Sequence, residues 1–103
     1  MGTGSEKVTW APSANADLDE VLARRADATN LLEDILDAAA SLSTLSERGR
    51  LVPEIGDAIT REIFVRDFRL MYEVSRERVH IVALMYGKRD FETWRRARRR
   101  GNL

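Results

Sequence analysis

The chain has 103 residues, with 17 basic and 17 acidic side chains, one histidine and no cysteine. This length predicts a single domain over residues 1–103, and the absence of cysteine excludes a disulfide framework, a thiolate metal site and a cysteine nucleophile. No apolar run approaches the roughly 20 residues that span a bilayer. Residues 1–7 contain no signal-peptide stretch, so we expect a cytoplasmic protein without membrane contact.

The zero net charge conceals an uneven distribution. Residues 1–57 carry 5 basic and 11 acidic side chains, a net charge of −6, whereas residues 58–103 carry 12 and 6, a net charge of +6. A basic half of a small domain can present a local anion-binding surface. The same distribution also fits two halves that pair with each other inside the fold, since exposed ion pairs are common and individually weak.

The first half of the chain predicts a strand followed by two helices. Residues 7–10 alternate in polarity and favour a short strand. A short helix follows, for which Ser13 or Asn15 offers an N-cap, with acidic residues in its first turns. Residues 28–45 carry an apolar stripe at helical spacing and predict a second helix. The two together predict an αα-hairpin.

The second half changes to a period of two. Residues 46–57 contain glycine and proline and interrupt the helical pattern. Three strands are then predicted, at 59–65, 68–74 and 78–86, with very short connections between them. Short connections join antiparallel neighbours, so these strands predict an antiparallel meander.

Beyond Gly87 the sequence predicts one further helix, from residue 91 to about residue 99, and a basic C-terminal tail at 95–103. Residues 1–6 are expected to be a flexible N-terminus. The predicted order is β-α-α-β-β-β with a C-terminal helix. It defines an α+β fold in which an antiparallel sheet carries two helices on one face.

Most groups that carry enzyme chemistry are missing. The sequence has no glycine-rich phosphate loop and no HExxH motif, and one histidine cannot form a histidine metal site. His80 alternates with apolar neighbours, which favours a surface position on a strand. Glu33, Asp34 and Asp37 indicate a solvated helix face rather than a convergent acid pair. We therefore expect no metal and no cofactor.

The remaining candidates are cationic. Arg61, Arg69 and Arg89 fall on or just after successive strands, so we expect them to converge across the sheet, where arginine suits bidentate phosphate contact. Trp94 and Tyr86 lie near these arginines in the sequence, and their rings are candidates for stacking on the bases of a nucleic acid. The ordinary interpretation is that the arginines pair with neighbouring glutamates and that the tryptophan is buried.

The C-terminal tail allows two interpretations as well. It is either a partner-binding segment or a set of charges that complements a helix C-terminus and aids solubility. The arginines concerned are Arg95, Arg96, Arg98 and Arg99.

Four segments, in the same order, resemble the ParE/RelE toxin superfamily. Residues 61–74 (REIFVRDFRLMYEV) resemble its strand pattern, and residues 78–91 resemble its last strand and "GxRDF" ending. Residues 47–54 (ERGRLVPE) resemble the link after its second helix, and residues 10–18 resemble its opening. The resemblance extends over residues 7–92, nearly the whole chain.

This resemblance implies a toxin of a bacterial type II toxin–antitoxin, or plasmid stabilisation, module. RelE-like members cleave mRNA in the ribosomal A site, whereas ParE-like members poison DNA gyrase. Because both branches share one fold, the fold alone does not decide the function.

The resemblance extends to individual positions. Arg69 and Arg89 match arginines of the RelE-like motifs. Two lysines that RelE-like enzymes use fall on Thr60 and Glu62 in this chain, and neither side chain can stabilise phosphate charge as lysine does. The tyrosine expected near the C-terminus of a RelE-like enzyme has no equivalent. If the protein is an enzyme, it is an endoribonuclease that depends on the two arginines; this pattern favours a non-enzymatic toxin.

The leading hypothesis is therefore a ParE-like toxin that inhibits DNA gyrase by protein–protein contact. A cognate antitoxin with an acidic helical C-terminal segment would neutralise it, within a toxin–antitoxin hetero-oligomer. Two alternatives stay open: a RelE-like mRNA interferase acting on the ribosome, and a non-toxic corepressor that binds the antitoxin. The residues expected to contact target or antitoxin are Arg61, Arg69, Arg89, Trp94, Arg95, Arg96, Arg98 and Arg99.

Overall fold

The computed structural model describes residues 6–87 and Arg96. The expected flexible terminus therefore lies outside the described residues except for Glu6. The predicted C-terminal helix and basic tail lie outside them except for Arg96, which is exposed. No helix in the described part of the chain combines the length and the apolar character needed to cross a membrane.

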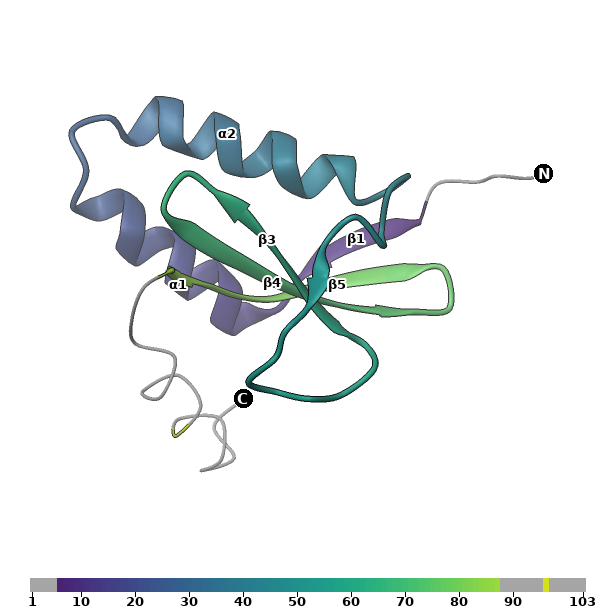
Figure 1. The fold of residues 1–103 in the computed structure, drawn as a ribbon. Helices are drawn as coiled ribbons and strands as arrows, with labels where there is room; N and C mark the ends of the chain where they lie inside the picture. The colour runs from purple at the N-terminus through teal and green to yellow at the C-terminus, as the bar shows by residue number, and fades with distance from the viewer. Residues whose placement is uncertain (1–5, 88–95, 97–103) are drawn as a thin grey trace.

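Two helices lie on one side of a five-stranded sheet (Figure 1). The predicted α+β fold is thus confirmed. The strands follow the order β1-β5-β4-β3-β2 across the sheet. The elements are β1 (Lys7–Trp10), α1 (Pro12–Ala23), α2 (Ala28–Ser41), β2 (Arg50–Leu51), β3 (Thr60–Val65), β4 (Phe68–Ser75) and β5 (Arg78–Tyr86).

The sheet is mixed rather than wholly antiparallel as predicted. The three strands β3, β4 and β5 form the expected antiparallel meander. β1, however, pairs with β5 in parallel, with Val8 opposite Val79. A parallel neighbour requires a long crossover, and the helical hairpin together with the first two meander strands supplies it. The two-residue strand β2, which the sequence did not predict, pairs with β3 at the other edge.

Helix α1 begins at Pro12, and its N-cap residue makes no side-chain capping bond. The predicted caps, Ser13 and Asn15, are therefore wrong. Proline at the first helical position has a preset φ and lacks an N–H that would need a partner. Asp17 does not sit in the first turn; its carboxylate accepts the Leu84 N–H at 3.0 Å and fastens α1 to β5.

Helix α2 ends at Ser41, four residues before the predicted boundary. The Ser41 hydroxyl donates to the Ala38 carbonyl at 2.6 Å, and hydrogen bonds of the tighter i→i+3 kind follow along residues 42–44. The apolar stripe of α2 is buried as its period requires, through Leu31 and Ile35.

The register of β3 against β4 divides the sheet into two faces. Ile63 lies opposite Leu70, and these side chains join the main core beneath the helices. Glu62 lies opposite Met71 on the other side, which we call the open face. A second apolar cluster covers part of the open face, and Ile55 from the preceding loop packs against it. Its buried members are Val52, Met71, Val82, Ala83 and Met85.

One arginine links the helical hairpin to the meander. Arg66 occupies the β3–β4 turn with a positive φ of 55°. Its guanidinium donates to Asp34 at 2.8 Å and to Asp27 at 3.0 Å. Arg25 binds the same Asp27 through two hydrogen bonds. The α1–α2 connection is therefore held against the turn by charge as well as by the core.

Candidate functional site

The structure does not bring the predicted arginines together. Arg61 lies opposite Tyr72 on the helix side of the sheet, whereas Arg69 lies opposite Phe64 on the open face. Successive side chains of a strand point to opposite faces, so the two guanidinium groups cannot meet across the sheet. The predicted convergence of Arg61 with Arg69 is wrong. Arg89, its third member, lies outside the described residues.

Arg61 holds a loop in place. Its Nη1 donates to the Gly49 carbonyl at 2.7 Å and to the Glu47 carbonyl at 3.5 Å. These are neutral backbone acceptors, so the contacts orient the chain between α2 and β2 without neutralising the guanidinium. Arg61 thus fixes the loop and keeps its positive charge.

A buried tyrosine holds the same loop from beneath. Tyr72 is fully buried; its hydroxyl donates to the Ser46 carbonyl at 2.8 Å and accepts the Gly49 N–H at 3.0 Å. Burial raises the pKa of Tyr72, so the hydroxyl stays protonated and able to donate. A Cβ on Gly49 would lie 2.5 Å from both the Tyr72 oxygen and the Glu62 carbonyl oxygen. The loop can therefore approach the sheet this closely only with glycine.

Four charged residues form an ion network on the open face: Arg50, Glu54, Glu62 and Arg69. Arg69 Nε donates to Glu62 Oε1 at 2.5 Å, and its two terminal nitrogens bind the Glu54 carboxylate at 3.0 and 3.3 Å. Arg50 Nε donates to Glu62 Oε2 at 2.6 Å. The Arg69 side chain is only 5% exposed and that of Glu62 is fully buried.

The charges within this network stabilise one another. Burial alone would lower the pKa of Arg69, but hydrogen bonds to Glu54 and Glu62 outweigh it and the pKa is raised. The hydrogen bonds from Arg69 in turn lower the pKa of Glu54. The Arg69 guanidinium is thus charged, but its charge is directed at two carboxylates.

The two positions where RelE-like enzymes carry lysine are engaged internally. Glu62 belongs to the ion network. Thr60 is buried, and its N–H and hydroxyl both donate to Asp57 at 2.7 Å. Burial would raise the pKa of Asp57, but the hydrogen bonds from Thr60 and Ile59 outweigh it and lower the pKa. Neither position offers a cation to a ligand.

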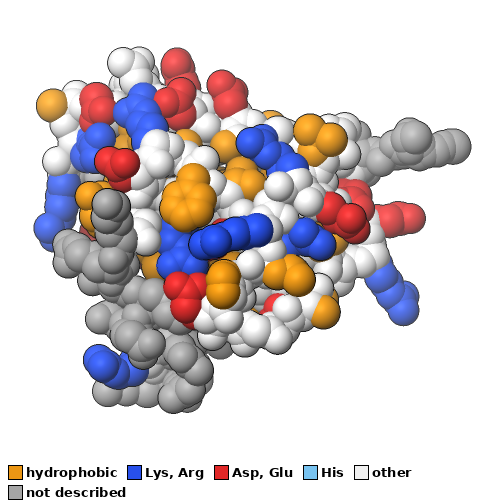
Figure 2. All heavy atoms as spheres, viewed as in Figure 1, with side chains coloured by type: hydrophobic (Ala, Val, Ile, Leu, Met, Phe, Trp, Pro, Cys, Tyr) orange, Lys and Arg blue, Asp and Glu red, His pale blue; other side chains and the backbone are white. Residues whose placement is uncertain are grey.

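An aromatic side chain and a cation lie exposed over the network. Phe64 is 54% exposed, and the Arg50 guanidinium lies 5.9 Å from the centre of its ring. Figure 2 shows hydrophobic and basic side chains adjacent to one another near the centre of this view, over β2 and β3. Sequence reasoning missed Phe64. Its signal was the two-residue turn after β3, which places Phe64 opposite Arg69.

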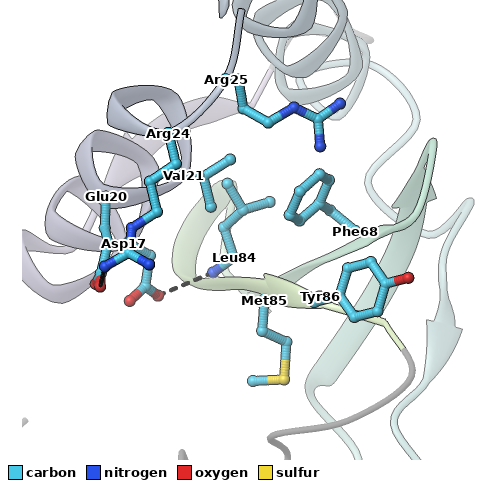
Figure 3. Close-up of a pocket in the computed structure, with 9 residues that line it drawn as sticks. All are labelled: Asp17, Glu20, Val21, Arg24, Arg25, Phe68, Leu84, Met85 and Tyr86. Carbon is cyan, nitrogen blue, oxygen red and sulfur yellow. Dashed lines mark hydrogen bonds and ion pairs between the residues drawn. The ribbon is translucent and has the colours of Figure 1, made fainter.

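A shallow pocket of about 380 Å³ lies between α1 and the ends of β4 and β5 (Figure 3). Phe68 and Tyr86 meet edge to face at 6.0 Å on one wall, and Arg25 lies over the Phe68 ring at 5.8 Å. Arg24 and Glu20 pair at 3.7 Å on the helix side. The lining residues are Asp17, Glu20, Val21, Arg24, Arg25, Phe68, Leu84, Met85 and Tyr86.

His80 is half-buried at the β1–β5 edge, where its Nδ1 lies 2.8 Å from the Thr9 hydroxyl. The described residues contain no group of three His, Cys, Asp or Glu side chains that could hold a metal ion. Of the predicted tail residues, Arg96 is exposed, and Trp94, Arg95, Arg98 and Arg99 lie outside the described residues.

Solved structures share this fold. A chromosomal ParDE toxin–antitoxin system from P. aeruginosa matches with a TM-score of 0.68 and 17% identity, over 82% of this chain and 98% of the other. The RelBE2 toxin–antitoxin complex from Mycobacterium tuberculosis matches with a TM-score of 0.63 and 19% identity, over 82% and 94%. The arrangement of helices and strands in this chain is thus shared with chains of both structures. No curated protein sequence matches this chain.

The family itself follows from the sequence profile. The model for the ParE toxin of the type II toxin–antitoxin system parDE matches residues 8–91. This range contains both helices, the entire sheet from Val8 onward and the ion network. The chain belongs to the ParE toxin family.

Proposed function

We propose that the protein is a toxin that inhibits DNA gyrase through protein–protein contact in the cytoplasm. Membership of the ParE family supports the toxin assignment. The non-enzymatic mode of action is supported by one observation: Arg69 is buried and is bound by Glu54 and Glu62. A non-enzymatic mode needs no exposed phosphate-binding cation at this position.

The same observation argues against an mRNA interferase. Cleavage through the RNA 2′-hydroxyl develops charge on a phosphate, which preorganised cations must stabilise. In this chain Arg69 has two carboxylate partners, and Thr60 and Glu62 replace lysines. A phosphate near Arg69 would also approach the carboxylates that hold it, and this repulsion opposes binding.

The decisive experiment compares two targets with one preparation of the full chain. Purified gyrase is assayed for DNA supercoiling and for accumulation of cleaved DNA, and programmed ribosomes are assayed by primer extension for cuts in the message. We expect inhibition of gyrase and no ribosome-dependent cleavage. Reproducible A-site cuts with an unaffected gyrase would reverse the assignment and make the protein an endoribonuclease.

We also propose a cognate antitoxin as the partner that silences the toxin. The two solved structures described above are toxin–antitoxin systems, and an acidic amphipathic segment would suit the helical hairpin and the basic second half of this chain. Apolar anchors would supply most of the affinity, while charge would mainly raise the association rate. Titration with the C-terminal peptide of the protein encoded beside the toxin gene tests this; no binding at micromolar concentration would contradict it.

Induction in cells separates a toxin from a corepressor of the same fold. A toxin that acts on gyrase should arrest growth with a DNA-damage response. An inert corepressor should leave growth unchanged while still binding the antitoxin peptide.

A further inference from the structure

The open face carries an exposed aromatic–cation pair, which we call the Arg50–Phe64 patch. Phe64 as a residue is 54% exposed, and the Arg50 side chain is 59% exposed. The backbone of Gly87 packs against the ring, since a Cβ there would lie 3.2 Å from Phe64 Cε2 and 3.0 Å from the Asp67 carbonyl oxygen. The ring is therefore supported on one side and open on the other.

The ion network pairs the carboxylates beside this patch with guanidinium groups of the chain itself. All four carboxylate oxygens of Glu54 and Glu62 accept hydrogen bonds from guanidinium groups. Arg50 uses only Nε for its bond to Glu62. Among the described residues, its two terminal nitrogens have no hydrogen-bond partner. They remain available to an acceptor outside the chain, and a carboxylate fits their geometry.

The network also fixes the patch before binding. Arg50 is held by Glu62, and Glu62 is held by the buried Arg69. Less side-chain entropy is lost when a partner binds a side chain that is already oriented. Exposed aromatic and arginine side chains supported in this way are typical of the few interface residues that dominate binding.

We infer that the Arg50–Phe64 patch binds the toxin's protein target, through a segment that presents a carboxylate beside an apolar side chain. The carboxylate pairs with the terminal nitrogens of Arg50 and the apolar side chain covers the Phe64 ring. This inference rests on the proposed function. The antitoxin is proposed to contact the helical hairpin and the basic second half of the chain, whereas the patch lies on the open face, away from that hairpin.

A nucleic acid fits the patch less well than a protein. Binding of a phosphate backbone requires several cations along its path. Here Arg69 is neutralised, and the Glu54 side chain, 41% exposed, lies next to Arg50 and would repel a polyanion. A single carboxylate needs only the two terminal nitrogens of Arg50.

The test uses two variants of the full chain, Phe64→Ala and Ile59→Ala. Ile59 is a matched control, because it is 45% exposed and directly precedes the other end of β3, where its carbonyl accepts the Val74 N–H. Half-maximal inhibition of purified gyrase should require about tenfold more Phe64→Ala than wild type. Ile59→Ala should inhibit like wild type, and thermal unfolding verifies that both variants fold.

Arg50→Lys supplies a second, independent variant. Lysine keeps the positive charge but lacks the planar fork, so we expect a loss of inhibition of about tenfold here as well. In parallel, binding of each variant to the C-terminal peptide of the protein encoded beside the toxin gene should equal that of wild type.

The possible outcomes are distinct. If Phe64→Ala inhibits gyrase like wild type, the inference is overturned while the proposed function stands. Weaker binding of the peptide with unchanged inhibition of gyrase would assign the patch to the antitoxin and also overturn it. A wild-type protein that does not inhibit gyrase would overturn the inference together with the proposed function.

Discussion

At the scale of single residues, Gly49 has no room for a side chain. A methyl group there would lie 2.5 Å from the Tyr72 hydroxyl and from the Glu62 carbonyl oxygen. The first contact would break the hydrogen bonds that hold the loop, and the second would push against a strand. Gly49→Ala should therefore lower the free energy of unfolding by about 1–3 kcal/mol, the usual cost of overpacking. Urea denaturation measures this.

Gly56 is the matched control for that substitution. It has a positive φ of 77°, but no atom lies within 4 Å of a Cβ built there. Asparagine adopts this backbone region more readily than other residues, so Gly56→Asn should cost no more than about 1 kcal/mol. Similar losses from both variants would show that steric contact does not distinguish the two sites.

Asp27 gives a prediction about pH. Hydrogen bonds from Arg25 lower the pKa of Asp27 from 3.8 to about 2, with Arg66 contributing. Because the pKa is lower in the folded protein than in the unfolded chain, this contribution to stability is complete above about pH 4 and is lost as the pH falls toward 2. The thermal midpoint of wild type should therefore fall more steeply in this range than that of Asp27→Asn.

Asp19→Asn serves as the control in the same titration. Asp19 lies exposed on α1 and makes no ion pair within the described residues. Its replacement should leave the steepness of the pH dependence as it is in wild type. A parallel fall for Asp27→Asn and wild type would contradict the proposed role of the Arg25–Asp27–Arg66 contacts.

At the scale of elements, the ion network joins β2, β3 and β4 with the loop at residue 54. Removing Arg69 alone would leave the fully buried Glu62 without its closest partner. Breaking a buried pair in this way costs about 3–5 kcal/mol, whereas replacing both partners with apolar residues is often neutral. Arg69→Met should therefore destabilise strongly, and Glu62→Leu/Arg69→Met should unfold within about 1 kcal/mol of wild type in urea.

The double variant should remain stable because the two charged residues left in the network lie near the surface. The remaining members, Arg50 and Glu54, are 59% and 41% exposed and can be solvated by water once their partners are gone. A double variant no more stable than Arg69→Met would show that the network contributes more than charge compensation. The single variant is also a poor probe of nuclease activity, because lost folding would resemble lost catalysis.

The meander shows how far sequence reasoning reaches at this scale. The turn at Arg66–Asp67 fixes Val65 opposite Phe68, and every later pair of β3 and β4 follows from that register. Counting alternate positions from this turn would have placed Arg61 and Arg69 on opposite faces. Their convergence was predicted from their positions on successive strands, without that count.

Other features had no local signal. β2 is only two residues long, so it has no periodicity to detect. The parallel pairing of β1 with β5 depends on tertiary packing, which the alternation of residues 7–10 does not encode. The Arg66–Asp67 turn does place Phe64 opposite Arg69, but the exposure of Phe64 is evident only in the fold.

At the scale of the whole molecule, the two oppositely charged halves pair in part. Arg66 binds Asp27 and Asp34, and Arg69 binds Glu54, so cations of the second half meet carboxylates of the first. In the opposite sense, Arg50 of the first half pairs with Glu62 of the second half. The interpretation in which the halves neutralise each other therefore holds for Arg66 and Arg69, whereas Arg61 contacts only backbone carbonyls.

The C-terminal arginines remain the subject of a prediction. Arg96 is exposed, and its neighbours in sequence lie outside the described residues. Reversing Arg95, Arg96, Arg98 and Arg99 to Glu should abolish growth inhibition with little change in thermal stability. Trp94→Ala should lower stability first. If the folded quadruple variant is still toxic, the tail is not part of the target surface, and the surface must then lie on the meander.

The parallel pairing of β1 with β5 also bears on when the toxin becomes active. Thr9 and His80, 71 residues apart, meet across this edge, so the first strand to be synthesised has no partner until the last one exists. Contacts so distant in sequence slow folding. A chain whose synthesis stops before residue 78 lacks β5, so β1 and β4 have no strand between them. The complete sheet thus forms only after β5 has been synthesised, because β5 is the strand that joins β1 to β4.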